Sequence, residues 1–139
     1  MLFRSEVRLS QDLRALDAAV IERGVAMVRD TARRIAGAGG VEAASTLKSF
    51  NRPAAMSARV VGAIGEVCAD LGIEPLGMPS GAGHDAQIMA PRWHTGMIFV
   101  PSRGGISHNA AEETDVAEIE TGARVLYRTL ERLIGAAAA

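Results

Sequence analysis

Two glycine-rich loops carry the side chains best suited to chemistry. The first is residues 80–85 (Ser-Gly-Ala-Gly-His-Asp), and the second is residues 102–109 (Ser-Arg-Gly-Gly-Ile-Ser-His-Asn). Each ends in or near a histidine, which can bind a metal, donate a hydrogen bond or move a proton. Each also follows a short apolar run that predicts a strand. Because ligand-binding groups of parallel α/β sheets gather beyond the carboxyl ends of the strands, we expect the two loops to share one crevice.

Simpler interpretations exist for the same residues. A glycine-rich loop before a helix is often only a turn, and neither loop has the Lys-Ser/Thr ending of a phosphate-binding loop. His94 opens a predicted strand and is expected to be structural or solvated, and Cys68 is expected to be a small core residue. A hydrolytic metal site needs three or four ligands. The chain has only three histidines and no closely spaced His/Asp/Glu set, so a complete site is not expected within it.

The elements that would position these loops alternate between strands and helices, which predicts an α/β architecture. In the first 50 residues the pattern predicts a strand (2–9), a long amphipathic helix with Ser10 as N-cap that stops at the glycines near position 40, and a second extended stretch (41–50). Beyond residue 51 it predicts helices at 60–71, at 84–90 and after a capping box of Asp115 and Glu118, with strands at 75–78 and 96–100.

Composition excludes several classes of protein. The chain has 139 residues, 48% of them hydrophobic and 22% charged, which is typical of a globular protein. The net charge is −1 and the basic residues are scattered, so no nucleic-acid partner is expected. No apolar run is long enough for a membrane span. A single cysteine and the lack of a signal peptide favour a cytoplasmic protein.

Longer stretches around both loops resemble signature segments of one enzyme family. Residues 78–87 and 97–112 resemble segments of the metal-dependent amidohydrolases of the N-carbamoyl-L-amino-acid hydrolase and allantoate amidohydrolase type, the hydantoinase/carbamoylase amidases. Glu6-Val7-Arg8 followed by Asp12 resembles the end of their lid domain. The resemblance covers essentially the whole chain but only the C-terminal part of a longer enzyme. It implies a partial lid or dimerisation domain (1–51, strand-helix-strand) and the C-terminal part of a mixed-sheet di-metal catalytic domain (52–139).

The same resemblance implies roles for individual residues. His108 matches the last protein ligand of a paired divalent metal site for Zn, Mn or Co. His84 matches the catalytic histidine that binds and polarises the scissile carbamoyl group. Arg8 matches the arginine that grips the substrate carboxylate, a task suited to a bidentate guanidinium. Gln87 and Asn109 stand beside these positions, and Gln87 is assigned to substrate binding.

The implied reaction is hydrolysis of a carbamoyl C–N bond in an N-carbamoyl amino acid or in allantoate. The other metal ligands and the glutamate base of the family lie in an N-terminal half that has no counterpart here, so negligible hydrolysis is expected from this chain alone. Its implied partners are a small ureido substrate and either a second copy or the missing N-terminal half. Two alternatives remain: a non-catalytic binding or dimerisation module derived from the family, and an unrelated α/β anion-binding protein.

Overall fold

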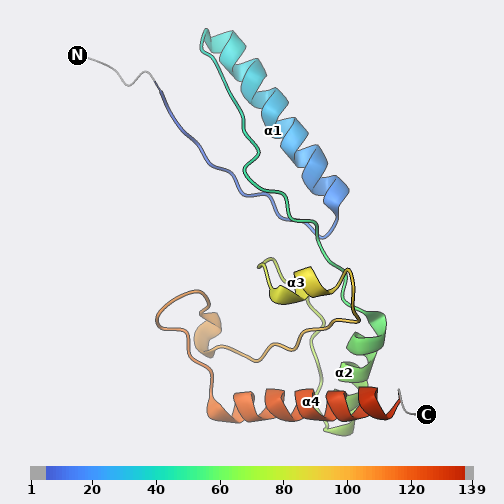
Figure 1. Cartoon of the computed structure of the whole chain (residues 1–139). Coiled ribbons are helices and arrows are strands. Elements are labelled where there is room, and N and C mark those ends of the chain that lie inside the picture. Colours follow the sequence, from blue (N-terminus) through green and yellow to red (C-terminus); the bar gives the residue numbers. More distant parts are fainter. Residues whose placement is uncertain (1–5, 137–139) are drawn as a thin grey trace. The chain divides into compact units, whose positions relative to one another are not determined.

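The structure, a computed structural model, describes residues 6–136 and divides the chain into two compact units, Met1–Pro53 and Ala54–Ala139. Figure 1 shows that every regular element in the described part is helical. None of the helices within residues 6–136 is long and apolar enough to cross a bilayer. The elements are α1 (Ala18–Gly39), α2 (Ala58–Asp70), α3 (Asp85–Met89), the 3-10 turn η1 (Arg103–Gly105) and α4 (Val116–Gly135).

The first unit is built around α1. Asp17 is its N-cap, and the carboxylate Oδ1 accepts a hydrogen bond of 2.8 Å from the backbone N–H of Ala19. The helix ends as predicted at the glycines, with Gly40 in the left-handed region at φ 65°. The predicted start at Ser10 is wrong. Leu13 belongs to the preceding segment and packs back onto the helix, where a Cβ added to Gly24 would lie 3.3 Å from Leu13 Cδ1.

The second unit has its core where α2 packs against α4. Val67 and Val125 are each only 3% exposed, and Cys68 beside them is also buried, which confirms its prediction as a core residue. Gly72, just beyond the helix predicted at 60–71, has φ 69° and ends the turn that follows α2. Half-buried apolar side chains complete this core: Ile64, Leu71, Ile73 and Ile98.

A charged fork also joins the two long helices of this unit. The guanidinium of Arg132 on α4 donates to Glu66 at 2.6 Å and to Asp70, both on α2. The hydrogen bond to Glu66 is the largest cause of a raised Arg132 pKa; desolvation opposes the rise, and the charge of Asp70 adds to it. Because all three groups reach solvent, the fork fixes the register of the helices more than it stabilises them.

The mixed-sheet part of the predicted fold is not confirmed. Residues 41–50, 75–78 and 96–100, all predicted as strands, are extended but form no ladder within residues 6–136. The predicted strand at 2–9 lies partly outside the described residues, and its residues 6–9 are extended without a ladder. An apolar, β-branched sequence favours extended backbone, but a strand also needs a neighbour for its N–H and C=O groups. No such neighbour is present in the described part of the chain.

Gly96 offers a test of the packing between α2 and the 96–100 segment. A Cβ added there would lie 2.6 Å from Val60 Cγ1 and 3.4 Å from Ile64 Cδ1. We expect Gly96→Ala to lower the free energy of unfolding by about 1–3 kcal/mol in urea titrations. The control is Gly65→Ala on α2, where an added Cβ meets nothing within 4 Å. That change is expected to raise stability by about 0.5–1 kcal/mol, and equal effects of the two changes would contradict the packing.

Candidate functional site

The first histidine of the predicted site, His84, is held at the start of α3. It is the N-cap residue and has extended backbone, with φ −134° and ψ 156°. Its Nε2 lies 2.8 Å from the hydroxyl oxygen of Ser80, four residues earlier in the glycine loop. That oxygen also accepts a 3.2 Å hydrogen bond from the backbone N–H of Ala82. The half-buried imidazole therefore has one nitrogen engaged by its own loop.

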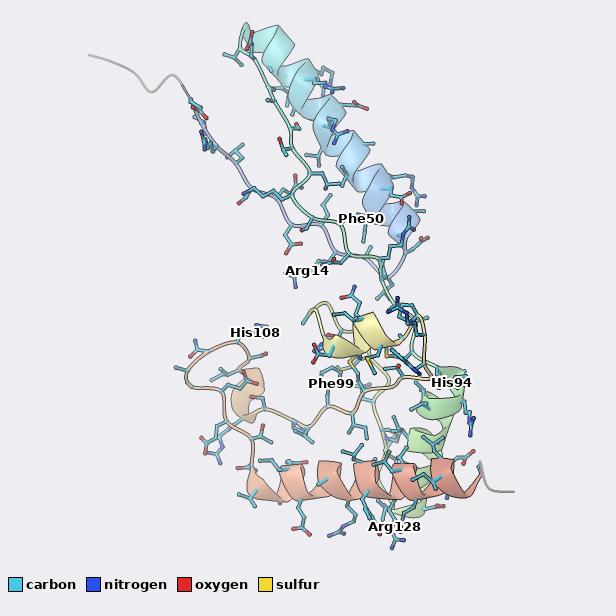
Figure 2. The ribbon with its side chains drawn as sticks, viewed as in Figure 1. Arg14, Phe50, His94, Phe99, His108 and Arg128 are labelled. Carbon is cyan, nitrogen blue, oxygen red and sulfur yellow. The ribbon has the colours of Figure 1, made fainter. Side chains whose placement is uncertain are left out.

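An aromatic contact also restrains this ring. Phe99, from the 96–100 segment, meets the His84 imidazole edge-on, with ring centroids 5.5 Å apart and an interplanar angle of 64°. Figure 2 shows Phe99 between α3 and α4. The imidazole therefore contacts both the Ser80 hydroxyl and the Phe99 ring.

Gln87 lies next to His84, as predicted. Its backbone N–H donates to the carbonyl of His84 at 2.9 Å, within the first turn of α3. A Cβ added to Gly83 would lie 3.9 Å from Gln87 Oε1, so the carboxamide lies against the glycine loop. The structure therefore brings His84 and Gln87 together at one loop.

The second histidine, His108, stands at an unusual point of the backbone. Its φ is 56°, a left-handed conformation that few residues other than glycine adopt. The carboxylate of Glu112 accepts a 2.9 Å hydrogen bond from the backbone N–H of His108. Asn109 closes the same turn, since its side-chain oxygen accepts from Ala111 N–H at 2.9 Å. These bonds leave the imidazole exposed to solvent.

The neck of the His108 loop is closed by Arg103. Its guanidinium donates to Glu113 at 2.9 Å and also to Asp115, and its backbone N–H donates to the Glu113 carbonyl at 2.7 Å. The predicted capping box at Asp115 does not form, because that carboxylate is engaged by Arg103 and makes no capping bond. The loop-shaping roles of Arg103 and Glu112 could not be predicted from their residue types alone. The one available signal was the group of acidic residues at Glu112, Glu113 and Asp115, which follows the loop in the sequence.

Both loops lie on the same side of the second unit. Figure 2 shows His108 at the tip of its loop, on the side away from α4, and α3 lies on that side as well. His84 and His108 are thus carried by loops on one side of this unit. The shared crevice itself stays a prediction.

Arg8, the third predicted site residue, belongs to the first unit. Its side chain is 89% exposed, and its Nε donates to the Glu6 carboxylate at 2.7 Å. An exposed pair two residues apart contributes little energy, so the guanidinium can exchange this partner for a substrate carboxylate. Its assigned role in substrate binding stays a prediction.

His94 has a structural contact. Its Nδ1 lies 3.0 Å from the hydroxyl of Ser57, the N-cap residue of α2, and Ser57 N–H donates to the carbonyl of Thr95 at 2.8 Å. These bonds tie the start of α2 to the segment that leads into residues 96–100. His94 was predicted to be structural or solvated, and it is an exposed residue with one contact to the start of α2.

Comparison with known proteins settles the family. The sequence profile described as peptidase family M20/M25/M40 matches residues 10–132. The chain belongs to this family. The resemblance inferred from the two glycine loops is confirmed by the relatives described next.

This M20/M25/M40 chain is similar to two groups of amidohydrolases. It is 37% identical to the allantoate amidohydrolase of Escherichia coli (strain K12) over 122 residues, and 36% identical to the N-carbamoyl-L-amino acid amidohydrolase of Geobacillus stearothermophilus over 122 residues. Each match covers 88% of the chain but 30% of the relative. The chain thus spans about a third of the length of these curated relatives.

A solved structure agrees with the sequence relatives. The amidase of the hydantoinase/carbamoylase family from Burkholderia multivorans superimposes with a TM-score of 0.77 at 37% sequence identity. The match covers 83% of this chain and 28% of that one. The fold of this M20/M25/M40 chain is therefore that of a carbamoylase-type segment, although the described residues form no sheet.

The described part of this M20/M25/M40 chain does not contain enough neighbouring side chains to bind a divalent metal ion by itself. Residues 6–136 contain no group of three or more His, Cys, Asp or Glu side chains that could hold a metal ion. The exposed imidazole of His108, which has no hydrogen-bonding partner among those residues, is suited to act as one ligand. The described residues could therefore supply one ligand to a metal site, but they do not form a complete site.

Proposed function

We propose that this chain is the C-terminal segment of a metal-dependent amidohydrolase that cleaves the carbamoyl C–N bond of allantoate or of an N-carbamoyl amino acid. The observation that carries the proposal is the pair of histidine-bearing loops on one side of the second unit. Similarity over 88% of the chain to amidohydrolases of both substrate classes supports it.

The chain's own side chains would bind and orient the substrate. His84, fixed by Ser80 and Phe99, would donate a hydrogen bond to the carbamoyl oxygen as negative charge develops there. Gln87, one turn along α3, would hold the ureido nitrogens through its carboxamide oxygen. Arg8 would bind the substrate carboxylate through its guanidinium, which a bidentate ion pair suits.

His108 would hold one of the divalent ions through its exposed imidazole. When bound, the metal supplies a water of lowered pKa as the nucleophile at neutral pH. The left-handed backbone at His108 and the Glu112 bond to its N–H fix where this ligand stands. The remaining ligands must come from polypeptide outside this chain.

The exposed surface of the chain also supports a longer functional unit. It exposes 11486 Å², whereas a compact protein of 14.6 kDa exposes roughly 6,900 Å² and two separate compact units of that total mass roughly 8,300 Å². Many large apolar side chains are exposed, including Ile119, Leu126 and Leu130 on α4. Surface of this kind is normally covered by further polypeptide.

Fragment complementation tests the proposal. The chain would be mixed with the part of the E. coli allantoate amidohydrolase that it does not match, and ammonia release would be followed with Zn²⁺, Mn²⁺ or Co²⁺. We expect no hydrolysis by either piece alone and metal-dependent hydrolysis by the pair. Assays on allantoate and on an N-carbamoyl amino acid would identify the substrate. A complex that forms but hydrolyses neither would favour the alternative, a non-catalytic assembly module.

His84 gives the sharpest site prediction within that assay. We expect His84→Ala to lower kcat of the assembled enzyme by a factor on the order of 10² to 10³, because a donor to the developing oxyanion is lost. The matched control is His94→Ala, since that imidazole contacts Ser57 and lies outside the two loops. Equal losses in the two variants would contradict the role of His84.

A further inference from the structure

The hydroxyl of Ser80 is the one polar side-chain group in the described structure that meets the His84 ring. It lies 2.8 Å from Nε2, and the pair is partly buried. The two residues are four positions apart and are joined by the glycine loop that leads into α3. A contact this short inside a partly buried loop restricts both the ring orientation and the position of its proton.

The other bond to the same oxygen leaves the Ser80 hydroxyl hydrogen available to donate. The backbone N–H of Ala82 already donates to Ser80 Oγ at 3.2 Å, so one lone pair of the hydroxyl is occupied. The hydroxyl hydrogen can be donated to Nε2 of His84, which lies 2.8 Å away. In neutral imidazole one ring nitrogen is an acceptor and the other carries the hydrogen. If Nε2 accepts from Ser80, the hydrogen is on Nδ1.

We infer that Ser80 is a positioning residue that fixes His84 as the Nδ1–H tautomer and thereby directs a hydrogen-bond donor toward the substrate's carbonyl oxygen. The nitrogen that carries the proton is set by the bond the other nitrogen makes. Nδ1 has no partner among the described residues, so its hydrogen is free for a ligand. Phe99 holds the ring edge-on at 5.5 Å and limits its rotation. The inference rests on the proposed function for its substrate and on the loop geometry for its tautomer.

The first test measures the tautomer in the chain itself. Histidine side-chain ¹⁵N chemical shifts distinguish the two neutral tautomers, and they would be recorded at a pH where the ring is neutral. We expect His84 to show Nδ1–H in the wild type, to show a mixture in Ser80→Ala, and to return to Nδ1–H in Ser80→Thr, which keeps the hydroxyl. An Nε2–H form in the wild type, or no change in Ser80→Ala, would overturn the inference.

The structure also offers a matched control for this measurement. Ser57 and His94 form a second serine–histidine contact, at 3.0 Å, away from the two loops. Ser57→Ala is expected to change the ¹⁵N shifts of His94 alone and to leave kcat of the assembled enzyme unchanged. A change at His84 in this variant would show that the shifts report a general disturbance, and it would overturn the inference.

The second test measures catalysis in the assembled enzyme. We expect Ser80→Ala to lower kcat about tenfold with KM changed less than about twofold, since the lost orientation matters in the transition state. An unchanged kcat would overturn the inference while leaving the proposed function intact. An inactive wild-type assembly would instead refute the proposed function, and the tautomer measurement would still decide the structural part.

Discussion

Replacing His108 by alanine is expected to abolish hydrolysis and weaken metal binding in the assembly of this chain with the complementing piece of the E. coli allantoate amidohydrolase. Loss of a group that merely hydrogen-bonds to a ligand costs about 10- to 100-fold in metal affinity or activity, and loss of the ligand itself should exceed that. Titration with Co²⁺ and ammonia-release kinetics on the same sample would measure both effects. Because the imidazole is exposed, its removal costs no buried packing in the chain.

The backbone at position 108 requires a second substitution. At φ 56° an alanine is strained, so a loss in His108→Ala could arise from a distorted loop. Asparagine tolerates this region much better, so His108→Asn keeps the loop and still removes the imidazole. We expect both variants to be inactive and His94→Ala to be active. Full metal binding in His108→Asn would refute the assignment of His108 as a ligand.

The helices were the part of the fold that could be predicted from the sequence. Apolar residues at three- to four-residue spacing and a glycine beyond the last turn predicted α2 and the end of α1, and Gly40 and Gly72 adopt the expected positive φ. The start of α1 was placed seven residues early. Leu13 and Leu16 continue the helical spacing, but Asp17 accepts the capping bond. Spacing alone cannot distinguish a helical turn from an extended segment that packs back on the helix.

The strands could not be predicted from the local pattern because their formation depends on other segments. The continuous apolar run at residues 96–100 has the composition of a buried parallel strand, yet it forms no ladder in the described structure. Pairing is decided by a neighbouring strand distant in sequence, and the relatives are about three times as long as this chain. We expect these extended segments to pair only in the assembled enzyme.

The residue types of the candidate site could be predicted from the sequence. The contacts that hold these residues in place could not. Histidines after glycine loops were identified as His84 and His108, and both lie in loops on one side of the second unit. The contacts of Ser80 to His84, of Glu112 to the His108 N–H and of Arg103 to Glu113 were not predicted. These contacts depend on loop geometry, which residue type and spacing do not specify.

Val125 and Leu126 are adjacent on α4 and are expected to respond in opposite ways to the same change. Val125 is 3% exposed and packs against Val67 and Cys68, whereas Leu126 is 52% exposed. Val125→Asp would bury a carboxylate with no partner at a cost of several kcal/mol, a large part of the 5–15 kcal/mol that typically stabilises a domain. We expect circular dichroism to show loss of the cooperative unfolding transition of this unit.

Leu126→Asp is expected to leave the chain folded and to impair its assembly. Ile119, Leu126 and Leu130 lie on one face of α4 and are each about half exposed, a face that the rest of a longer amidohydrolase would cover. A carboxylate on that face would be desolvated in the complex, so binding of the complementing piece should weaken by roughly tenfold or more. Isothermal titration with the complementing piece would measure this loss. Wild-type affinity in Leu126→Asp would mean that the complementing piece does not cover this apolar face of α4. The large exposed area of the chain would then need another explanation.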